Sequence, residues 1–169
     1  MTLHSIKFWD FSTRLYEMSG VAEICLELQE QLSLDVNIIL FCFWGAHIKD
    51  TPTELQWEDI IEFSRDWKKN FVQPLRSVRN SLKREINNYP RTKDFETLRK
   101  RVKNDELAAE QIQQEIIQSK IETRDLKFQP FSRSDAMKHL AYYLAEEGIV
   151  LTDALKNKLD EIAKNVSLM

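Results

Sequence analysis

The spacing of apolar positions predicts helices along most of the chain. Apolar residues recur three or four positions apart in a first segment that ends before Gly20, and again between Val21 and Leu32. The segment from Val36 to about Lys49 is apolar on nearly every side of a helix. Because such a helix is typical of a core, we expect it to be the most buried element of the fold. A buried strand would also fit this short run, but the sequence offers it no strand partner.

The next segment predicts a long helix that bends at a proline. Thr51, Pro52 and Glu54 form the signature of a helix start, with Thr51 as the predicted N-cap. An apolar stripe follows, and Pro74 interrupts it by removing one backbone donor and crowding the preceding turn. We therefore expect a kink or a short break at residues 72–74.

The rest of the chain is more polar. Residues 93–124 carry a sparse apolar stripe that includes Ile112, and they predict one long outer helix, or two with a weak point at Asn104-Asp105. Ser134 and Thr152 are the predicted N-caps of two C-terminal helices.

These patterns together predict an all-α fold. We expect a single helical domain of about six to eight helices around a central apolar helix, with one or two long outer helices. The three glycines agree with this, because tight hairpins and phosphate-binding loops depend on glycine. We expect residues 1–124 to form a helical core with a basic middle segment. Residues 125–169 should form a helical pair that packs on this core or extends from it.

The charged residues are unevenly distributed. Between Arg65 and Lys103 there are thirteen Lys/Arg and four Asp/Glu residues, a net charge of +9, whereas the whole chain carries −3. Four of these cations are predicted to share one face of the helix after Pro74, namely Arg76, Arg79, Lys83 and Arg84.

Two interpretations of this basic face stay open. It is a binding site for the phosphate groups of nucleic acid or another polyanion, or its cations are structural. In the second case they pair with the acidic N-terminal helices around Glu23, Glu27 and Glu58, or they form a solvated face.

A second candidate site lies in the N-terminal half. Its residues are Trp9, Asp10, Tyr16, Asp35, Asn37 and Trp44. Asn37 stands near the start of the most apolar helix, where it is either the polar floor of an aromatic pocket or a structural group that bonds a neighbouring loop, with Asp35 as the helix cap. The aromatic residues are either pocket walls or core.

The sequence gives little indication of chemistry. The three histidines have no neighbours at metal-ligand spacing, and there is no nucleophile motif, P-loop or glycine-rich dinucleotide turn. We therefore assign no catalytic residue, metal or cofactor. Cys25 and Cys42 lie in apolar stretches and are predicted to be buried free thiols. With no apolar run near the roughly 20 residues that span a bilayer, we expect no membrane partner and a cytoplasmic location.

An N-terminal block of aromatic, turn and polar positions resembles a known family. The block reads Phe8-Trp9-Asp10-Phe11-Ser12, Leu15-Tyr16, Gly20-Val21, Cys25-Leu26 and Leu28-Gln29, followed by Asp35-Val36-Asn37, Leu40-Phe41 and Trp44. It is similar to a family of small proteobacterial proteins catalogued as conserved and uncharacterised, over about residues 6–116. The resemblance brings no activity, substrate, cofactor or catalytic residue with it.

Three hypotheses about function follow. We rank first a non-enzymatic cytoplasmic module that docks a protein partner through the basic segment or the long outer helix, which would also serve for self-association. The second is nucleic-acid or polyanion binding through residues 65–103. The third is an enzyme or carrier with an aromatic-lined apolar pocket. A cavity of roughly several hundred Å³ that contains Asp10, Asp35 or Asn37 would favour this third hypothesis.

Overall fold

The computed structural model describes residues 7–49, 52–122 and 126–169. Its helices, in chain order, are α1 (Phe8–Tyr16), α2 (Val21–Leu32), α3 (Val36–Gly45), α4 (Glu54–Trp67), the π-helical turn η2 (Lys68–Val72), α5 (Gln73–Glu85), α6 (Thr92–Ile121), α7 (Arg133–Glu146) and α8 (Asp153–Val166). Within the described ranges there is no strand, although Ile48 and Phe128 form an isolated antiparallel bridge. The all-α prediction is confirmed.

Helix α3 lies at the centre of the core, as predicted. Every residue from Asn37 to Gly45 is buried, and α1, α2, α6 and α7 all contact this helix. Phe41 is completely buried, and the centroid of its ring lies 5.7 Å from that of Phe8 and 5.2 Å from that of Trp57. Helix α3 is apolar on nearly every side because other helices pack against it from several directions.

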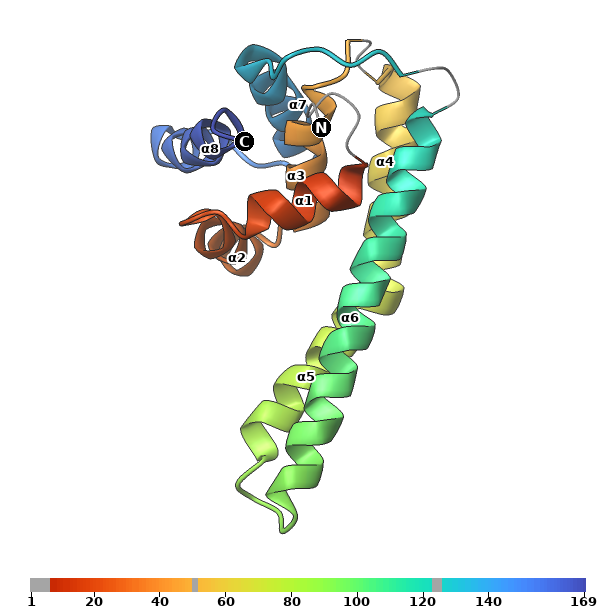
Figure 1. The fold of residues 1–169 in the computed structure, drawn as a ribbon, viewed down its shortest axis with the longest axis vertical. Coiled ribbons are helices and arrows are strands. Elements are labelled where there is room, and N and C mark those ends of the chain that lie inside the picture. The colour runs from red at the N-terminus through yellow and green to blue at the C-terminus, as the bar shows by residue number, and fades with distance from the viewer. Residues whose placement is uncertain (1–6, 50–51, 123–125) are drawn as a thin grey trace.

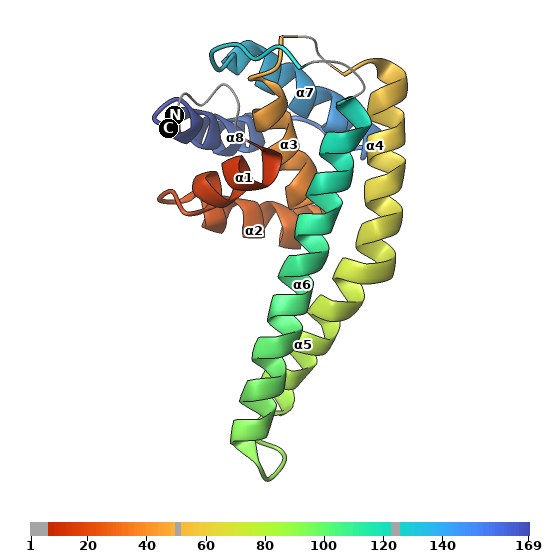
Figure 2. The same ribbon diagram turned by 45° about the vertical axis from the view of Figure 1, so that its right-hand side comes forward.

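The molecule has a body and an arm (Figures 1 and 2). In the body, α1, α2, α3, α7 and α8 gather at one end, with α4 and the C-terminal half of α6 along one side. The arm, residues 73–106, consists of α5, the turn after it and the N-terminal half of α6, and it projects beyond the body. Helix α6 is continuous over 30 residues, about 45 Å at 1.5 Å per residue, so Asn104-Asp105 does not divide it.

The helical path changes direction between α4 and α5 (Figure 2). The turn η2 is π-helical, and the N–H of Gln73 donates to the carbonyl of Lys68, five positions earlier. Pro74 is the second residue of α5 and has no N–H to donate. The wider π turn gives room to the backbone that the proline ring would otherwise crowd. The irregularity predicted at residues 72–74 is therefore a bend in a continuous helical segment, without a break.

Helix α4 begins with a capping box. The hydroxyl of Thr53 accepts a hydrogen bond of 3.3 Å from the N–H of Gln56, and the Gln56 side chain accepts one of 2.9 Å from the N–H of Thr53. The predicted cap, Thr51, lies outside the described residues. Thr53 takes the role because it holds the extended backbone that places its hydroxyl over the first turn.

The two C-terminal helices pack on the N-terminal helices of the body. Helix α7 contacts α3, α8 contacts α2, and their apolar residues join the same buried cluster as those of the N-terminal helices. Ser132 caps α7 by accepting a 3.2 Å hydrogen bond from the N–H of Asp135, so the predicted cap Ser134 is wrong. Thr152 caps α8 as predicted. None of the described helices has both the length and the apolar character needed to cross a bilayer.

Candidate functional site

A cavity of about 510 Å³ lies between the body and the arm. Its lining comes from α1, α2 and α3 on one side and from α5 and α6, at the base of the arm, on the other. Figure 2 shows α6 passing beside α1 and α3. Three residues of the predicted pocket line it, Trp9, Tyr16 and Asn37, and so do two residues of the predicted basic face, Arg76 and Arg79. The fold thus brings residues of two separately predicted sites to one place.

The other candidate residues lie elsewhere. Trp44 is buried in the core, where its ring stacks on Phe8 with centroids 5.3 Å apart, and it is not part of the cavity lining. Asp10 is exposed on α1 and is also outside the lining. Lys83 and Arg84 are exposed further along α5. Asp35 is buried at the start of α3, behind Asn37.

On the arm side, two arginines share two carboxylates. The Nε of Arg76 donates to Glu106 Oε1 at 2.8 Å, and its Nη2 donates to Glu110 Oε1 at 2.8 Å. The Nε of Arg79 donates to Glu106 Oε2, and its Nη2 donates to Glu106 Oε1 at 3.3 Å. The arginine side chains are only 19% and 23% exposed, which favours the structural one of the two interpretations left open for Arg76 and Arg79.

The structural interpretation named partners around Glu23, Glu27 and Glu58, but Arg76 and Arg79 have other partners. Glu27 of α2 pairs with Lys158 of α8. Arg76 and Arg79 instead find carboxylates on α6, which are 27 to 34 positions away in the chain. The reason is the antiparallel arrangement of the arm, because α6 returns along α5 and supplies the nearest acidic side chains.

The two carboxylates have opposite pKa shifts. Burial raises the pKa of Glu106, but hydrogen bonds from Arg79 and Arg76 outweigh it and hold that pKa below its ordinary value of 4.5. Burial raises the pKa of Glu110 to about 7, since Arg76 offsets it only in part and the charges of Glu106 and Asp35 add to it. Glu110 therefore exchanges a proton near neutral pH, and the charge of the cavity wall changes with it.

A chain of side-chain amides joins α3 to α6 beside the cavity. Asp35 Oδ2 accepts from Gln113 Nε2 at 2.8 Å, and Gln113 Oε1 accepts from Asn37 Nδ2 at 2.7 Å. Asn37 Oδ1 in turn accepts from Gln114 Nε2 at 2.7 Å. Asn37 and Gln114 both line the cavity. The chain ends at Gln114 Oε1, a buried oxygen with no hydrogen-bond partner among the described residues.

Asp35 anchors the other end of this chain. Its Oδ1 accepts a 2.9 Å hydrogen bond from the N–H of Asn37, which makes it the N-cap of α3 as predicted. Burial raises the pKa of Asp35 above its ordinary value of 3.8, while the hydrogen bond from Gln113, the charge of Lys68 and the Asn37 N–H oppose this shift. Both carboxylate oxygens act as acceptors, as an ionised side chain requires.

The sequence analysis missed four polar residues of the site. They are Glu106, Glu110, Gln113 and Gln114. They follow the helical register of Val102 and Ala109, and they share with them the face of α6 that packs on the rest of the molecule. The predicted apolar stripe contained the buried residues Val102 and Ala109 but also Ile112, which is 45% exposed, and it left out the polar residues between them. The signal that would have found the site is a run of Glu and Gln at the spacing of a buried helix face.

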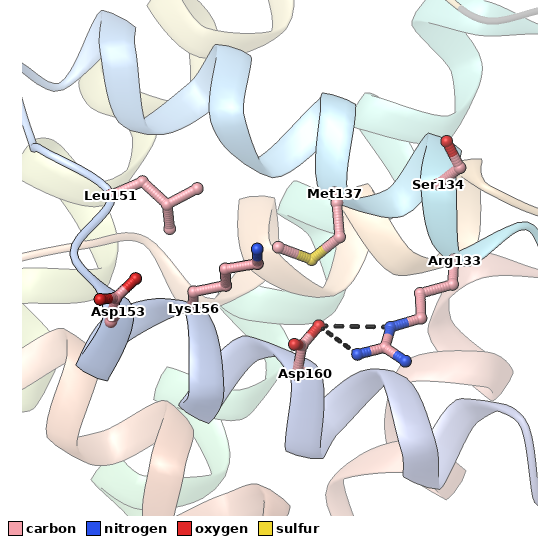
Figure 3. Close-up of a pocket in the computed structure, with 7 residues that line it drawn as sticks. All are labelled: Arg133, Ser134, Met137, Leu151, Asp153, Lys156 and Asp160. Carbon is pink, nitrogen blue, oxygen red and sulfur yellow. Dashed lines mark hydrogen bonds and ion pairs between the residues drawn. The ribbon is translucent and has the colours of Figure 1, made fainter.

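A second and more open groove lies between α7 and α8 (Figure 3). It has a volume of about 710 Å³, and Met137 and Leu151 contribute its apolar lining. Arg133 and Asp160, which also line it, already form an ion pair of 2.8 Å with each other. Most of its polar lining residues are exposed, namely Arg133, Ser134, Asp153 and Lys156, so it is the weaker candidate.

Metal and thiol chemistry find little support in the described residues. Among them, no group of three or more His, Cys, Asp or Glu side chains is placed to hold a metal ion. Cys25 and Cys42 are buried free thiols as predicted. Burial raises the pKa of Cys25 to about 12 and raises that of Cys42 as well, which disfavours the reactive thiolate form.

A family model matches most of the chain. The family is described as Protein of unknown function (DUF2390), and its model matches residues 7–117. The chain belongs to the DUF2390 family. The matched residues agree with the extent of the resemblance seen in the sequence. That the family occurs in proteobacteria stays a prediction. Every residue of the cavity lining of this DUF2390 protein lies inside the matched region, whereas α7 and α8 lie outside it. No curated protein and no solved structure matches the chain.

Proposed function

We propose that this DUF2390 protein binds a small organic molecule in the cavity between the body and the arm. The observation that carries the proposal is the cavity itself, a space of about 510 Å³ that residues of five helices line. The proposal corresponds to the third hypothesis from the sequence, in its carrier form.

The size and the composition of the lining support this function. A volume of about 510 Å³ falls within the range of roughly 300–1,000 Å³ that is typical of small-molecule sites. Trp9, Tyr16, Leu26 and Leu107 provide apolar walls, and the polar side chains of α3, α5 and α6 interrupt them. Such a lining holds an apolar body and fixes its orientation through a few hydrogen bonds.

A variant that narrows the cavity tests the proposal. Leu107 lines the cavity and is 50% exposed, so Leu107→Trp adds bulk at the site without removing a core contact. Leu98 lies on the same helix, is 45% exposed and does not line the cavity, so Leu98→Trp is the matched control. The two variants and the wild-type protein are screened against a diverse library of small organic molecules by differential scanning fluorimetry, and hits are measured by calorimetry.

We expect hits that raise the Tm of the wild-type protein and of Leu98→Trp but not that of Leu107→Trp. This pattern follows from a ligand that occupies the cavity, because only Leu107→Trp removes space from it. Compounds that stabilise all three proteins equally, or a library that yields no hit, contradict the proposal.

The distal arm, residues 80–103, supports a second candidate function. It contains eight Lys/Arg and three Asp/Glu residues, and Lys83 and Arg84 are exposed. The arm projects from the body (Figure 1), which leaves this surface open to a large partner. These features support the docking of nucleic acid on the distal arm, away from the two arginines of the cavity. The cytoplasmic interaction module with a protein partner, ranked first from the sequence, stays a prediction.

A further inference from the structure

We infer that a second site, a polar groove between α2 and α5, binds a sugar phosphate. The groove has a volume of about 380 Å³ and is a different space from the cavity, although Gln29 and Arg76 line both. Its other lining residues are Glu30 and Ser33 at the C-terminal end of α2, Lys68 of η2, and Gln73, Ser77, Asn80, Ser81 and Arg84 of α5. The inference goes beyond the proposed function, because it assigns a separate site with a different kind of ligand.

One face of α5 forms a long wall of this groove. Five lining residues recur at steps of three and four positions and therefore share that face, namely Gln73, Ser77, Asn80, Ser81 and Arg84. Leu75 and Leu82 fall on the opposite face of the helix. None of the described lining residues of the groove is apolar. Such a lining suits a ligand rich in oxygen atoms, since it gives an apolar ring nothing to pack against.

The charges of the lining favour a ligand with a negative group. Three of the lining residues are cations and one is a carboxylate: Lys68, Arg76, Arg84 and Glu30. Arg76 is committed to two carboxylates of α6 that lie outside this lining. Lys68 and Arg84 form no ion pair with another described residue. The charge of Lys68 acts on Asp35, but this carboxylate is buried, and both its oxygens already accept hydrogen bonds from α3 and α6.

Both of these cations have N–H groups left for a ligand. The ammonium of Lys68 donates one of its three N–H bonds to the carbonyl of Ser33, at 2.6 Å. Arg84 Nη2 donates to Ser81 Oγ at 3.1 Å, which uses one of the five N–H bonds of the guanidinium. Arg84 is exposed and Lys68 is partly exposed, so a molecule in the groove can reach them. With the hydroxyls of Ser77 and Ser81 beside them, they supply the several donors that the oxygens of a phosphate group accept from.

The hydroxylated part of the ligand follows from the rest of the lining. Glu30 is exposed and forms no ion pair with another described residue. Its carboxylate can only accept hydrogen bonds, so it repels a phosphate and pairs with hydroxyl groups. The side-chain amides of Gln29, Gln73 and Asn80 both donate to and accept from hydroxyl groups. The volume is at the lower end of the range of roughly 300–1,000 Å³ for small-molecule sites, which leaves room for a sugar beside the phosphate.

Three matched probes test the inference by isothermal titration calorimetry at pH 7.5 and low salt. Glucose 6-phosphate has both the phosphate and the hydroxyl groups, glucose lacks the phosphate, and inorganic phosphate lacks the sugar. We expect the wild-type protein to bind glucose 6-phosphate at least about tenfold more tightly than glucose and at least about threefold more tightly than inorganic phosphate.

Charge variants locate the phosphate. Lys68→Met and Arg84→Met each remove a cation of the lining, and we expect each to weaken binding of glucose 6-phosphate about three- to tenfold. Lys69→Met removes an exposed cation next in the chain that does not line the groove, so it is the matched control, with unchanged affinity expected. Because Lys68 also bonds the end of α2, the Tm of each variant is measured to show that a lost affinity is not a loss of folding.

A further variant locates the sugar. Glu30→Gln removes both the repulsion of the phosphate and the strongest acceptor for hydroxyl groups. We expect it to bind inorganic phosphate as tightly as the wild-type protein or more tightly, while its preference for glucose 6-phosphate over inorganic phosphate falls. A structural role of Glu30 would leave that ratio of affinities unchanged.

Several outcomes overturn the inference. Equal affinities for glucose 6-phosphate and glucose remove the phosphate, and equal affinities for glucose 6-phosphate and inorganic phosphate remove the sugar. Equal effects of Lys68→Met and Lys69→Met place the ligand outside the groove. If glucose 6-phosphate does not bind, but Lys68→Met weakens binding of a DNA duplex and Lys69→Met does not, the groove holds the phosphates of a nucleic acid and the assignment of a sugar phosphate is wrong.

Discussion

At the residue scale, Asn37 shows how a polar side chain is held in an apolar helix. Both ends of its amide are paired, one with Gln113 and the other with Gln114. Burial of an amide is tolerated only when its hydrogen bonds are made. Asn37 therefore ties α3 to α6 and at the same time lines the cavity. Its hydrogen-bonding partners lie on a helix, and not on the neighbouring loop that the structural interpretation expected.

The prediction for the core concerns Phe41. It has no exposed surface, and three aromatic rings surround it. We expect Phe41→Ala to lower the free energy of unfolding by about 3–5 kcal/mol, because the change removes a large buried side chain and leaves a void. Urea denaturation measures this loss. Leu55→Ala, at a position that is 77% exposed, serves as the control, with a change of no more than about 0.5 kcal/mol. Similar losses in both variants would contradict the central position of Phe41.

At the element scale, ion pairs join α5 to the middle of α6. No residue of α5 is fully buried, and its two inward arginines meet the carboxylates of α6. The stability of an arm that is paired in this way depends on the protonation state of its carboxylates as well as on apolar packing. Glu110 is the carboxylate with a pKa near neutrality.

Glu110 is predicted to make stability fall as the pH rises. Burial raises its pKa from 4.5 to about 7 in the folded chain, so between these values the folded protein holds a proton that the unfolded chain has released. The free energy of unfolding therefore decreases from about pH 5 to pH 7 and levels off above that. In Glu110→Gln this loss should shrink by up to about 3 kcal/mol.

Urea denaturation at pH 5, 6, 7 and 8 measures the effect as the difference between the wild-type and variant curves. Glu96→Gln, an exposed position on the same helix, is the control and should keep the wild-type slope. Parallel curves for wild type and Glu110→Gln would show that Glu110 ionises normally in the folded state.

At the scale of the whole molecule, the cations divide into two groups. Arg76 and Arg79 at the base of the arm are neutralised by α6, whereas Lys83 and Arg84 of the distal arm are exposed. The basic segment of the sequence thus has a structural part and a part that is open to solvent. The exposed part lies on an arm that projects beyond the body (Figure 1).

The two groups of cations are predicted to respond differently to substitution. Arg79→Ala leaves Glu106 with one partner fewer and should lower the free energy of unfolding by about 1–3 kcal/mol. The double change Lys83→Ala with Arg84→Ala should leave stability nearly unchanged. The logarithm of the affinity for DNA falls linearly with the logarithm of the salt concentration when a protein contacts phosphates. If the distal arm makes such contacts, the double change makes this slope less steep by about one to two units.

Thermal denaturation and fluorescence anisotropy with a labelled DNA duplex at several salt concentrations measure both effects. A loss of stability in the double variant, or a parent protein that shows no salt-dependent binding, would rule out the distal arm as a nucleic-acid site.

The sequence by itself determined the helices, the buried centre and the bend. The apolar circumference of α3, the cap at Asp35 and the irregularity before Pro74 depend on residues within a few positions of one another. Side-chain periodicity, hydrogen bonds of a first turn and the missing N–H of proline act over that range, so a pattern in the sequence is enough to predict them.

Only the tertiary structure decided the site. Asn37 meets Gln113 across 76 positions of the chain, and Arg79 meets Glu106 across 27. Whether a cation is paired, and whether an amide faces a cavity or a core, depends on how the arm returns along itself and packs against the body. Helical periodicity places Glu106 and Gln113 on one face of α6, but it does not say which helix covers that face. The long-range packing of α6 on α1, α3 and α5 supplied that information.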